Sequence, residues 1–167
     1  MAANPEQRIS RLALLSGAER KRALYDWNST STDYGADRCL HEIISEQSRA
    51  NPGTVAVIFE GERLSYRQLD EQANQLAHYL TSLGVGPERR VGLVMERSLD
   101  LVVAMLGVRK AGGADVPIDG SNPNQRIEYA LADAGVEVVI AEERMREVVE
   151  GKARFVVSMG REREQIA

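Results

Sequence analysis

Residues 91–119 constrain the fold of this chain more than any other stretch. They begin with an apolar run at 91–95, which is typical of a buried strand. Ser98 then opens a segment with apolar residues at helical spacing, Gly112-Gly113 stops it, and a second apolar run occupies 114–118. A strand, a helix and a strand in this order form a β-α-β unit, whose two strands run parallel. We therefore expect an α/β fold.

The same alternation continues on both sides of this unit. The predicted flanking elements are, in order, a helix at 38–50, a β-hairpin at 54–65, a helix at 66–83, a helix at 123–134, a strand at 136–140, a helix at 142–150 and a strand at 154–157. Gly84 and Gly135 are the expected stops of two helices, and Asn122 is the expected N-cap of the helix after Asp119. Four apolar strands separated by helices indicate a mostly parallel sheet with helices on both faces.

Three regions differ in composition. Residues 1–37 are expected to be a linker or peripheral helical segment, in which Ser16 and Glu19 form a capping box for a short helix that ends near Trp27. Residues 38–160 are the predicted α/β part, and residues 161–167 a charged tail.

Composition excludes several classes of function. The chain of 167 residues is 43% hydrophobic, carries a net charge of −4, and scatters its Lys and Arg, so nucleic-acid binding is not expected. The single Cys39 excludes an internal disulfide and is expected to be a small buried or half-buried residue, and His41 and His78 alone are too few for a histidine zinc site. No stretch approaches the roughly 20 apolar residues of a membrane span, and residues 1–10 lack an apolar signal core, so we expect a soluble cytoplasmic protein.

The glycine-rich segments do not fit a phosphate loop. Gly84-Val85-Gly86 and Gly112-Gly113 each follow a helix and precede a strand. A dinucleotide fingerprint needs the opposite order, because the phosphate meets a helix N-terminus. We interpret both segments as structural stops.

Three pairs of acidic residues could suggest a site: Glu60 with Glu62, Asp115 with Asp119, and Glu142 with Glu143. The first pair flanks a hairpin turn, and the third opens a helix, where acidic residues suit the dipole. Asp119 is the best-placed acid, because ligands of doubly wound sheets lie at the carboxyl ends of strands. Its simpler interpretation is an Asp that starts a turn with Ser121 and Asn122. The residues alone therefore give no catalytic constellation.

Two segments resemble core motifs of the adenylation domains of nonribosomal peptide synthetases. Residues 64–69, LSYRQL, resemble the first motif, L-[TS]-Y-x-E-L, and residues 109–119, RKAGGADVPID, resemble the second, roughly L-K-A-G-x-A-Y-V-P-[LI]-D. The intervening sequence and the N-terminal LLSGAER and LHEIISEQSRANP segments are similar to the family as well, so the resemblance covers about residues 14–140. Asp115, Gly120 and Asn122 depart from the residues usual at their positions, and a charged Asp115 in a buried strand is unexpected.

The resemblance implies an AMP-forming enzyme that uses ATP and magnesium to make an aminoacyl-adenylate and loads it onto a carrier-protein thiol. The third motif, a Ser/Thr/Gly-rich phosphate loop ending in P-K-G, and all later motifs do not occur in these 167 residues. No catalytic, cofactor-binding or metal-binding residue of the family can therefore be assigned here, and we expect no turnover by the chain alone.

The leading hypothesis is the N-terminal portion of an adenylation domain, with the remainder of that domain as partner, possible contacts to condensation and carrier domains, and possible self-association. Three alternatives stay open. One is half of a split enzyme, another a non-enzymatic module that docks on synthetase domains through residues 1–28, and the last a small flavodoxin-like ligand binder.

Overall fold

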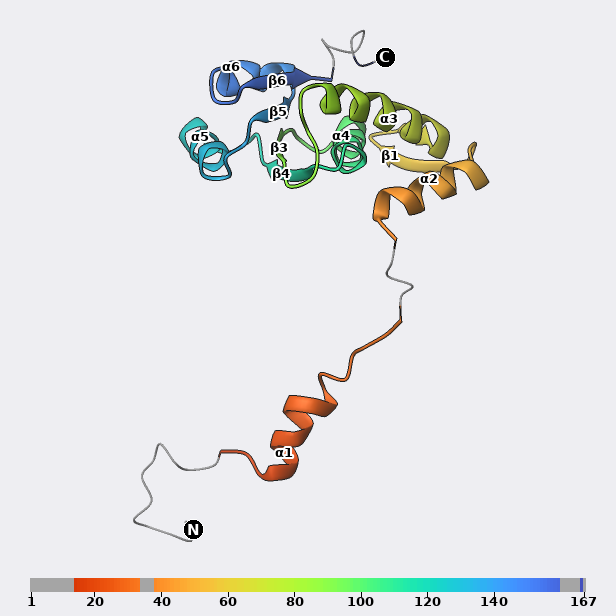
Figure 1. The fold of residues 1–167 in the computed structure, drawn as a ribbon, viewed down its shortest axis with the longest axis vertical. Coiled ribbons are helices and arrows are strands. Elements are labelled where there is room, and N and C mark those ends of the chain that lie inside the picture. Colours follow the sequence, from red (N-terminus) through yellow and green to blue (C-terminus); the bar gives the residue numbers. More distant parts are fainter. Residues whose placement is uncertain (1–13, 34–37, 160–165, 167) are drawn as a thin grey trace. The chain divides into compact units, whose positions relative to one another are not determined.

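In the computed structural model of this chain, residues 14–33, 38–159 and 166 are described. The chain divides into two units, Met1–Asp37 and Arg38–Ala167, and each is described by itself. Figure 1 shows the helix α1 of the first unit and the sheet with its helices in the second. Of the predicted tail at 161–167, only Ile166 lies within the described residues.

The described residues of the first unit form a short helical segment. Helix α1 (Gly17–Lys21) begins at the predicted capping box, in which Ser16 Oγ accepts the Glu19 N–H at 3.2 Å and Glu19 Oε2 accepts the Ser16 N–H at 2.7 Å. It continues into a π-helical turn, η2 (Arg22–Asp26), which Asn28 closes by donating to the carbonyl of Leu24 at 3.0 Å. The predicted helix from Ser16 to about Trp27 is confirmed.

A four-stranded parallel sheet forms the centre of the second unit. Its strands are, in spatial order, β4 (Ala114–Ile118), β3 (Arg90–Val94), β5 (Val138–Ala141) and β6 (Phe155–Ser158). All neighbouring pairs run parallel, and the two strands of the predicted β-α-β unit, β3 and β4, pair directly. The predicted α/β fold with a mostly parallel sheet is confirmed.

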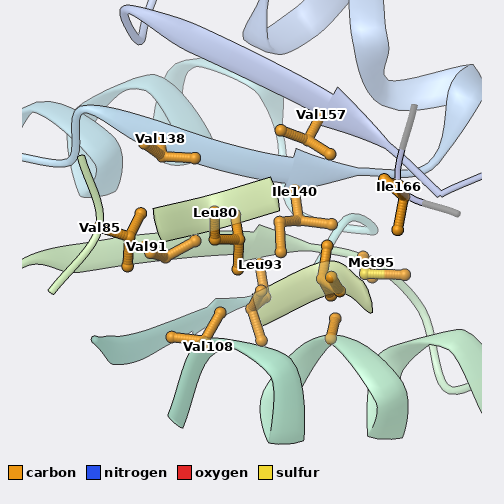
Figure 2. Packing of buried hydrophobic residues seen from close by; sticks show 12 residues of the cluster. Leu80, Val85, Val91, Leu93, Met95, Val108, Val138, Ile140, Val157 and Ile166 are labelled. Atoms are coloured by element: carbon orange, nitrogen blue, oxygen red, sulfur yellow. The ribbon is translucent and has the colours of Figure 1, made fainter. Parts of the chain in front are cut away.

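Successive residues of a strand point to opposite sides of the sheet, so both faces of this sheet carry apolar side chains. Helices cover both faces. One face packs on α3 (Tyr66–Ser82) and α4 (Leu99–Lys110), and Figure 2 shows its cluster, which includes Leu80, Val91, Leu93, Val108, Ile140 and Val157. The other face packs on α5 (Asn124–Asp133) and α6 (Arg146–Val149) through Val94, Ile127, Leu131, Val139 and Val149. The burial of apolar side chains on two faces of one sheet accounts for the stability of this layer.

Helices α3, α4 and α5 end as their glycines predict. Gly84, Gly112 and Gly135 follow α3, α4 and α5 and have φ angles of 90°, 82° and 60°. In each case the next N–H donates back into the last helical turn, as in the 3.0 Å bond from Val85 to the carbonyl of Leu80. This is the Schellman motif, in which a glycine adopts a left-handed conformation that other residues disfavour.

Helix α2 (Leu40–Ala50) and an antiparallel hairpin complete the second unit. The hairpin consists of β1 (Val55–Phe59) and β2 (Glu62–Ser65), as predicted. Its two-residue turn places Glu60 at φ 47° and Gly61 at φ 89°. Leu64 of β2 packs with Leu69 of α3 and beside α4, which attaches the hairpin to the helical layer.

One local prediction was wrong, and a second one holds for the position of a helix but not for its type. Asn122 is not the N-cap of α5, because Pro123 holds that position and its carbonyl accepts the first helical N–H, while Asn122 Nδ2 donates to the carbonyl of Asp119 at 3.0 Å. The helix predicted at 142–150 is a 3₁₀ turn, η3 (Glu143–Met145), followed by the short α6. Within the described residues, no helix has the length and apolar character needed to cross a membrane.

Candidate functional site

The carboxyl ends of β3 and β4 open into a pocket of about 670 Å³, which we call the strand-end pocket. Its lining is apolar toward the sheet and polar toward the loops, with Phe59, Leu93, Met95, Leu101, Pro117 and Ile118 in the first group and Glu96, Arg97, Asp119 and Ser121 in the second. Phe59 comes from the hairpin and Leu101 from α4, so four elements build the pocket. This edge of a parallel sheet is where ligands of such folds bind.

Asp119 lies at the rim of this pocket, as its position after β4 predicts. Its Oδ1 accepts the Ser121 N–H at 2.9 Å, and this bond, aided by the positive charge of Arg97, holds the pKa of the Asp119 carboxyl below its ordinary value. The carboxylate is exposed and starts the turn that the simpler interpretation predicts. Asp119 therefore has a demonstrated structural role and a position that faces a pocket.

A cluster of one basic and two acidic side chains, Arg144 with Glu96 and Glu142, lies beside the pocket, at the boundary between β3 and β5. The chain runs from β3 to β4 on one side and then to β5 on the other, which makes the β3–β5 crevice the topological switch point. There Glu142 Oε1 accepts the Glu96 N–H at 2.6 Å, while Arg144 pairs with Glu142 at 2.7 Å and with the Glu96 carboxylate at 2.5 Å. These two carboxylates raise the pKa of Arg144. The charges at this end of the crevice are thus paired with one another.

The position predicted for Glu142 at a helix start is confirmed, since Glu142 is the N-cap of η3, but the sequence-based interpretation missed a distant contact. It grouped Glu142 with Glu143 as ordinary acids at a helix start, but the Glu142 carboxylate bonds to a loop 46 residues away. Only the pairing of β3 with β5 brings these loops together, with Val94 opposite Ala141. No local pattern in the sequence could have indicated this contact.

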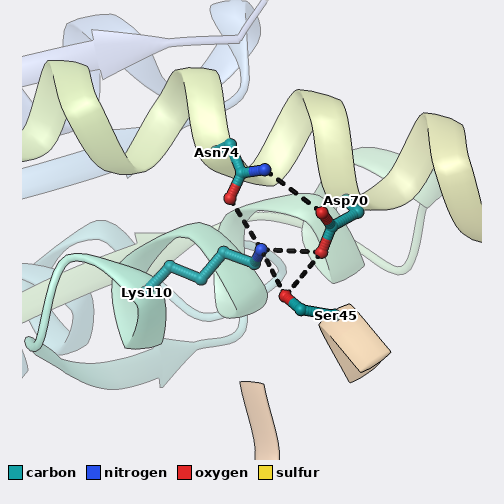
Figure 3. Close-up of polar contacts among 4 residues, drawn as sticks. All are labelled: Ser45, Asp70, Asn74 and Lys110. Atoms are coloured by element: carbon teal, nitrogen blue, oxygen red, sulfur yellow. Dashed lines mark hydrogen bonds and ion pairs between the residues drawn. The ribbon is translucent and has the colours of Figure 1, made fainter. Parts of the chain in front are cut away.

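A second polar cluster joins three helices away from the pocket (Figure 3). The Lys110 ammonium donates to Ser45 Oγ at 2.9 Å, Asp70 Oδ1 at 2.7 Å and Asn74 Oδ1 at 2.7 Å, and its side chain is only 8% exposed. Burial pushes the pKa of Asp70 upward, but the bonds from Lys110, Ser45 and Asn74 outweigh it, so that this pKa lies below its ordinary value. All three ammonium hydrogens are used inside the fold, so Lys110 is a structural residue.

The unexpected charge of Asp115 in a buried strand is balanced by Arg109, which belongs to the same motif. Its carboxylate accepts from Arg109 Nε at 2.9 Å and from a second guanidinium nitrogen at 3.4 Å, and its side chain is 11% exposed. Asp115 pairs with Val91 in the register of β3 and β4, so it lies on the sheet face that α4 covers. The second motif has Leu and an aromatic residue at positions 109 and 115. Here an ion pair replaces that apolar pair, which satisfies a carboxylate that would otherwise be buried alone.

The remaining candidates have local structural roles. The predicted stops at Gly84 and Gly112 are confirmed, and the hairpin turn is formed by Glu60 and Gly61, directly before Glu62 of β2. Cys39 is exposed rather than buried, because it precedes α2 as its N-cap, where its N–H donates to Glu42 Oε2 at 2.9 Å. In the part of the chain that the structure describes, no three His, Cys, Asp or Glu side chains are placed to hold a metal ion.

The described residues do not fit a magnesium nucleoside triphosphate. The strand-end pocket presents two carboxylates, Glu96 and Asp119, against the single cation of Arg97. A triphosphate needs several N–H groups and cations that converge on it. Lys110 and Arg144, which could supply charge, are each paired within the fold.

A family model described as AMP-binding enzyme matches residues 44–165, which include both strands that form the pocket. The chain belongs to this family. It is 42% identical over 146 residues to gramicidin S synthase 2 of Brevibacillus brevis, covering 87% of this chain and 3% of that protein. It is 42% identical over 140 residues to bacitracin synthase 3 of Bacillus licheniformis, covering 84% of this chain and 2% of that protein.

Solved structures agree with this assignment. The nonribosomal peptide synthetase FmoA3, in a form bound to alpha-methyl-L-serine-AMP, superposes with a TM-score of 0.75 at 30% identity, over 83% of this chain and 16% of that one. The N-terminal subdomain of Klebsiella oxytoca NpsA gives 0.64 at 32% identity, over 77% of this chain and 31% of that one. This member of the AMP-binding family therefore corresponds to the N-terminal part of a synthetase adenylation domain, as the two motifs predict. It spans about 3% of the length of gramicidin S synthase 2.

Proposed function

We propose that this chain supplies the first α/β layer of an amino-acid adenylation domain and does not turn over alone. The parent reaction is the ATP-dependent formation of an aminoacyl-adenylate and its transfer to a carrier-protein thiol. The match to the family over residues 44–165 carries this proposal. Among the described residues, Arg97 is the only cation that lines the strand-end pocket. This supports the proposal that the chain does not turn over alone.

The direct test is amino-acid-dependent ATP–pyrophosphate exchange by the purified chain, assayed with each proteinogenic amino acid. We expect exchange at the level of buffer alone, because the described residues do not bring together the cations and N–H groups that stabilise charge on the α-phosphorus. A complete adenylation domain at equal concentration is the positive control. Robust exchange by the chain would overturn the proposal.

The chain could contribute to catalysis by complementation. A separate polypeptide with the rest of the adenylation domain would then restore pyrophosphate exchange, at rates that rise with the concentration of either polypeptide. Such restoration would identify the chain as half of a split enzyme.

We propose the cytoplasm as the location of this chain, because the parent reaction consumes ATP.

A non-enzymatic docking role is the second candidate, and one observation favours it. On the first unit, Tyr25 and Trp27 are 68% and 70% exposed, and aromatic side chains are enriched at protein interfaces. Condensation and carrier domains are the proposed partners. A pulldown with isolated domains, compared between the full chain and a Trp27→Ala variant, tests this role.

On the second unit, the exposed Ile58 of β1 supports possible self-association of the chain, which light scattering would detect.

A further inference from the structure

The loop between β3 and α4, residues 95–98, is held by contacts from across the sheet. The Glu96 N–H donates to Glu142 Oε1 at 2.6 Å, and the Glu96 carboxylate pairs with Arg144 at 2.5 Å. Both partners lie in the segment that follows β5, the strand that pairs with β3. The loop after one strand is therefore tied to the segment after its neighbour.

The segment that makes these contacts has a buried base. Met145, next to Arg144, is buried and packs with Ile118 in the cluster on the α5 face of the sheet. Its N–H donates to the carbonyl of Glu142 at 2.8 Å, which closes the turn η3. A Cβ at Gly120 would lie 3.6 Å from Met145 Cγ, so Met145 also lies against the loop after β4. The turn η3 therefore presents Glu142 and Arg144 from a fixed position.

The loop itself has little apolar anchorage. Met95 is buried at its start, whereas Glu96 and Arg97 are exposed and Ser98 is half-buried. Ser98 is the N-cap of α4, where its Oγ accepts the Leu101 N–H at 3.1 Å. Segments with few buried apolar contacts open locally at a lower free energy than the whole domain unfolds. Residues 96–98 form such a segment, and the cluster of Arg144 with Glu96 and Glu142 opposes its opening.

The contacts that oppose opening depend on charge. The side chains of Arg144, Glu96 and Glu142 are 54%, 52% and 25% exposed, so solvent ions reach the pairs. The Debye length falls from about 10 Å at 0.1 M salt to about 3 Å at 1 M, which weakens exposed ion pairs. The apolar packing of Met145 does not weaken in this way. Salt should therefore loosen the loop and leave the base of η3 in place.

We propose that Arg144 is a positioning residue, whose ion pairs hold the loop at 95–98 closed and make the local opening of this loop sensitive to salt. Its Nη2 binds the Glu96 carboxylate while its Nε binds Glu142, a two-sided contact that suits the planar guanidinium. Opening of the loop frees the chain just before the N-cap Ser98 and moves Arg97, which lines the strand-end pocket. The inference does not depend on the proposed function, because the contact lies within this chain.

Hydrogen exchange at the Glu96 amide tests this assignment, because its N–H bonds to the Arg144 cluster itself. Exchange with water is measured by NMR at single backbone amides of the full chain. We expect a rise in NaCl from about 0.1 M to about 1 M to speed exchange at Glu96 by at least about threefold. The internal control is the Ser65 N–H, which donates to the neutral Gln68 Oε1 at 2.9 Å and should not respond to salt.

Two variants separate charge from shape. Arg144→Met should speed exchange at Glu96 by about threefold at low salt and remove the response to salt. Glu142→Gln keeps an oxygen that can accept the Glu96 N–H but removes its charge, and it should change both quantities in the same direction. The matched control is Arg89→Met, which breaks the exposed pair with Glu137 at the opposite end of the β3–β5 pair and should leave Glu96 unchanged.

Exchange at Glu96 that responds neither to salt nor to Arg144→Met would overturn the proposal. An equal acceleration at Ser65, or the same acceleration of Glu96 in Arg89→Met, would assign the effect to a general loosening of the fold and overturn it as well. The salt series on the wild-type chain needs no substitution, so it decides the proposal even where a variant does not fold.

Discussion

The ammonium nitrogen of Lys110, in the second family motif, lies 2.7 Å from Oδ1 of Asp70, the residue that follows the first motif. Asp70 directly follows the first motif at 64–69, and Lys110 is the second residue of the motif at 109–119. The pair links α3 to α4, and Ser45 adds α2 to the same cluster. The second motif is therefore tied to the helix that begins in the first motif, and this contact is structural.

Replacement of Lys110 by Met should destabilise the second unit strongly. The variant removes the cation but leaves the largely buried Asp70 carboxylate without its main partner. Because Asp70 keeps some solvent contact, we expect a loss of about 2–3 kcal/mol of unfolding free energy, below the ~3–5 kcal/mol typical of fully buried pairs. The measurement is urea unfolding followed by far-UV circular dichroism. Lys152→Met, which breaks the exposed pair with Glu128, is the matched control and should lose less than about 1 kcal/mol. Equal losses in both variants would contradict the role of Lys110.

Acid should weaken the same cluster through Asp70. The pKa of Asp70 is lower in the folded chain than its ordinary value, so the folded state binds this proton less readily than the unfolded state. The stabilisation is therefore complete above the unfolded pKa, about 4, and is lost as the pH falls through the lower folded value. We expect the urea midpoint to fall less between about pH 6 and about pH 3 in Asp70→Asn than in the wild type. An identical fall in the two proteins would show that Asp70 is not the group responsible.

Much of the fold could be predicted from the sequence, because its signals are local. The period of Leu69, Ala73, Leu76 and Leu80 predicts α3 and its buried face, and all four are buried as expected. The stops at Gly84 and Gly112 depend only on backbone conformation within one turn. In contrast, Asn122 and Pro123 compete for one cap, and the turn that begins at Asp119 decides the outcome.

The candidate site could be predicted only in part. The order of strands and helices placed Asp119 correctly at the sheet edge, since that position follows from topology. The contacts of Glu142 with Glu96 and of Lys110 with Asp70 span 46 and 40 residues, and no local spacing encodes them. The depth of the pocket depends on Phe59 of the hairpin, whose position relative to the sheet the sequence does not give.

Substitution of Gly107 should show how closely α4 approaches α3. A Cβ at this position would lie 2.8 Å from Leu76 Cδ2 and 3.1 Å from Leu76 Cβ, so the side chain cannot avoid the clash by rotating its tip. We expect Gly107→Val to lose about 1–3 kcal/mol through overpacking, although valine is a better helix former than glycine. Ala132→Val, at an exposed position of α5, isolates the effect of helix propensity and should lose roughly 0.5 kcal/mol. Thermal unfolding measures both, and a Gly107→Val variant as stable as the wild type would exclude the close approach.

The hairpin turn offers a stabilising change. Glu60 holds a φ of 47°, a left-handed conformation that is unfavourable for most residues with a Cβ, and Gly61 follows at 89°. These angles suit a two-residue turn of the Asn-Gly type, since Asn tolerates this conformation better than Glu. We expect Glu60→Asn to raise the unfolding free energy by about 0.5–1 kcal/mol, because less strain remains in the folded turn. Glu62→Asn makes the same change two residues later, within β2, where Asn is a poorer strand former and should not stabilise. Urea unfolding of the two variants separates relief of backbone strain at residue 60 from a general effect of removing a negative charge. If both variants, or neither, are more stable than the wild type, the backbone at residue 60 is not the source of the stabilisation.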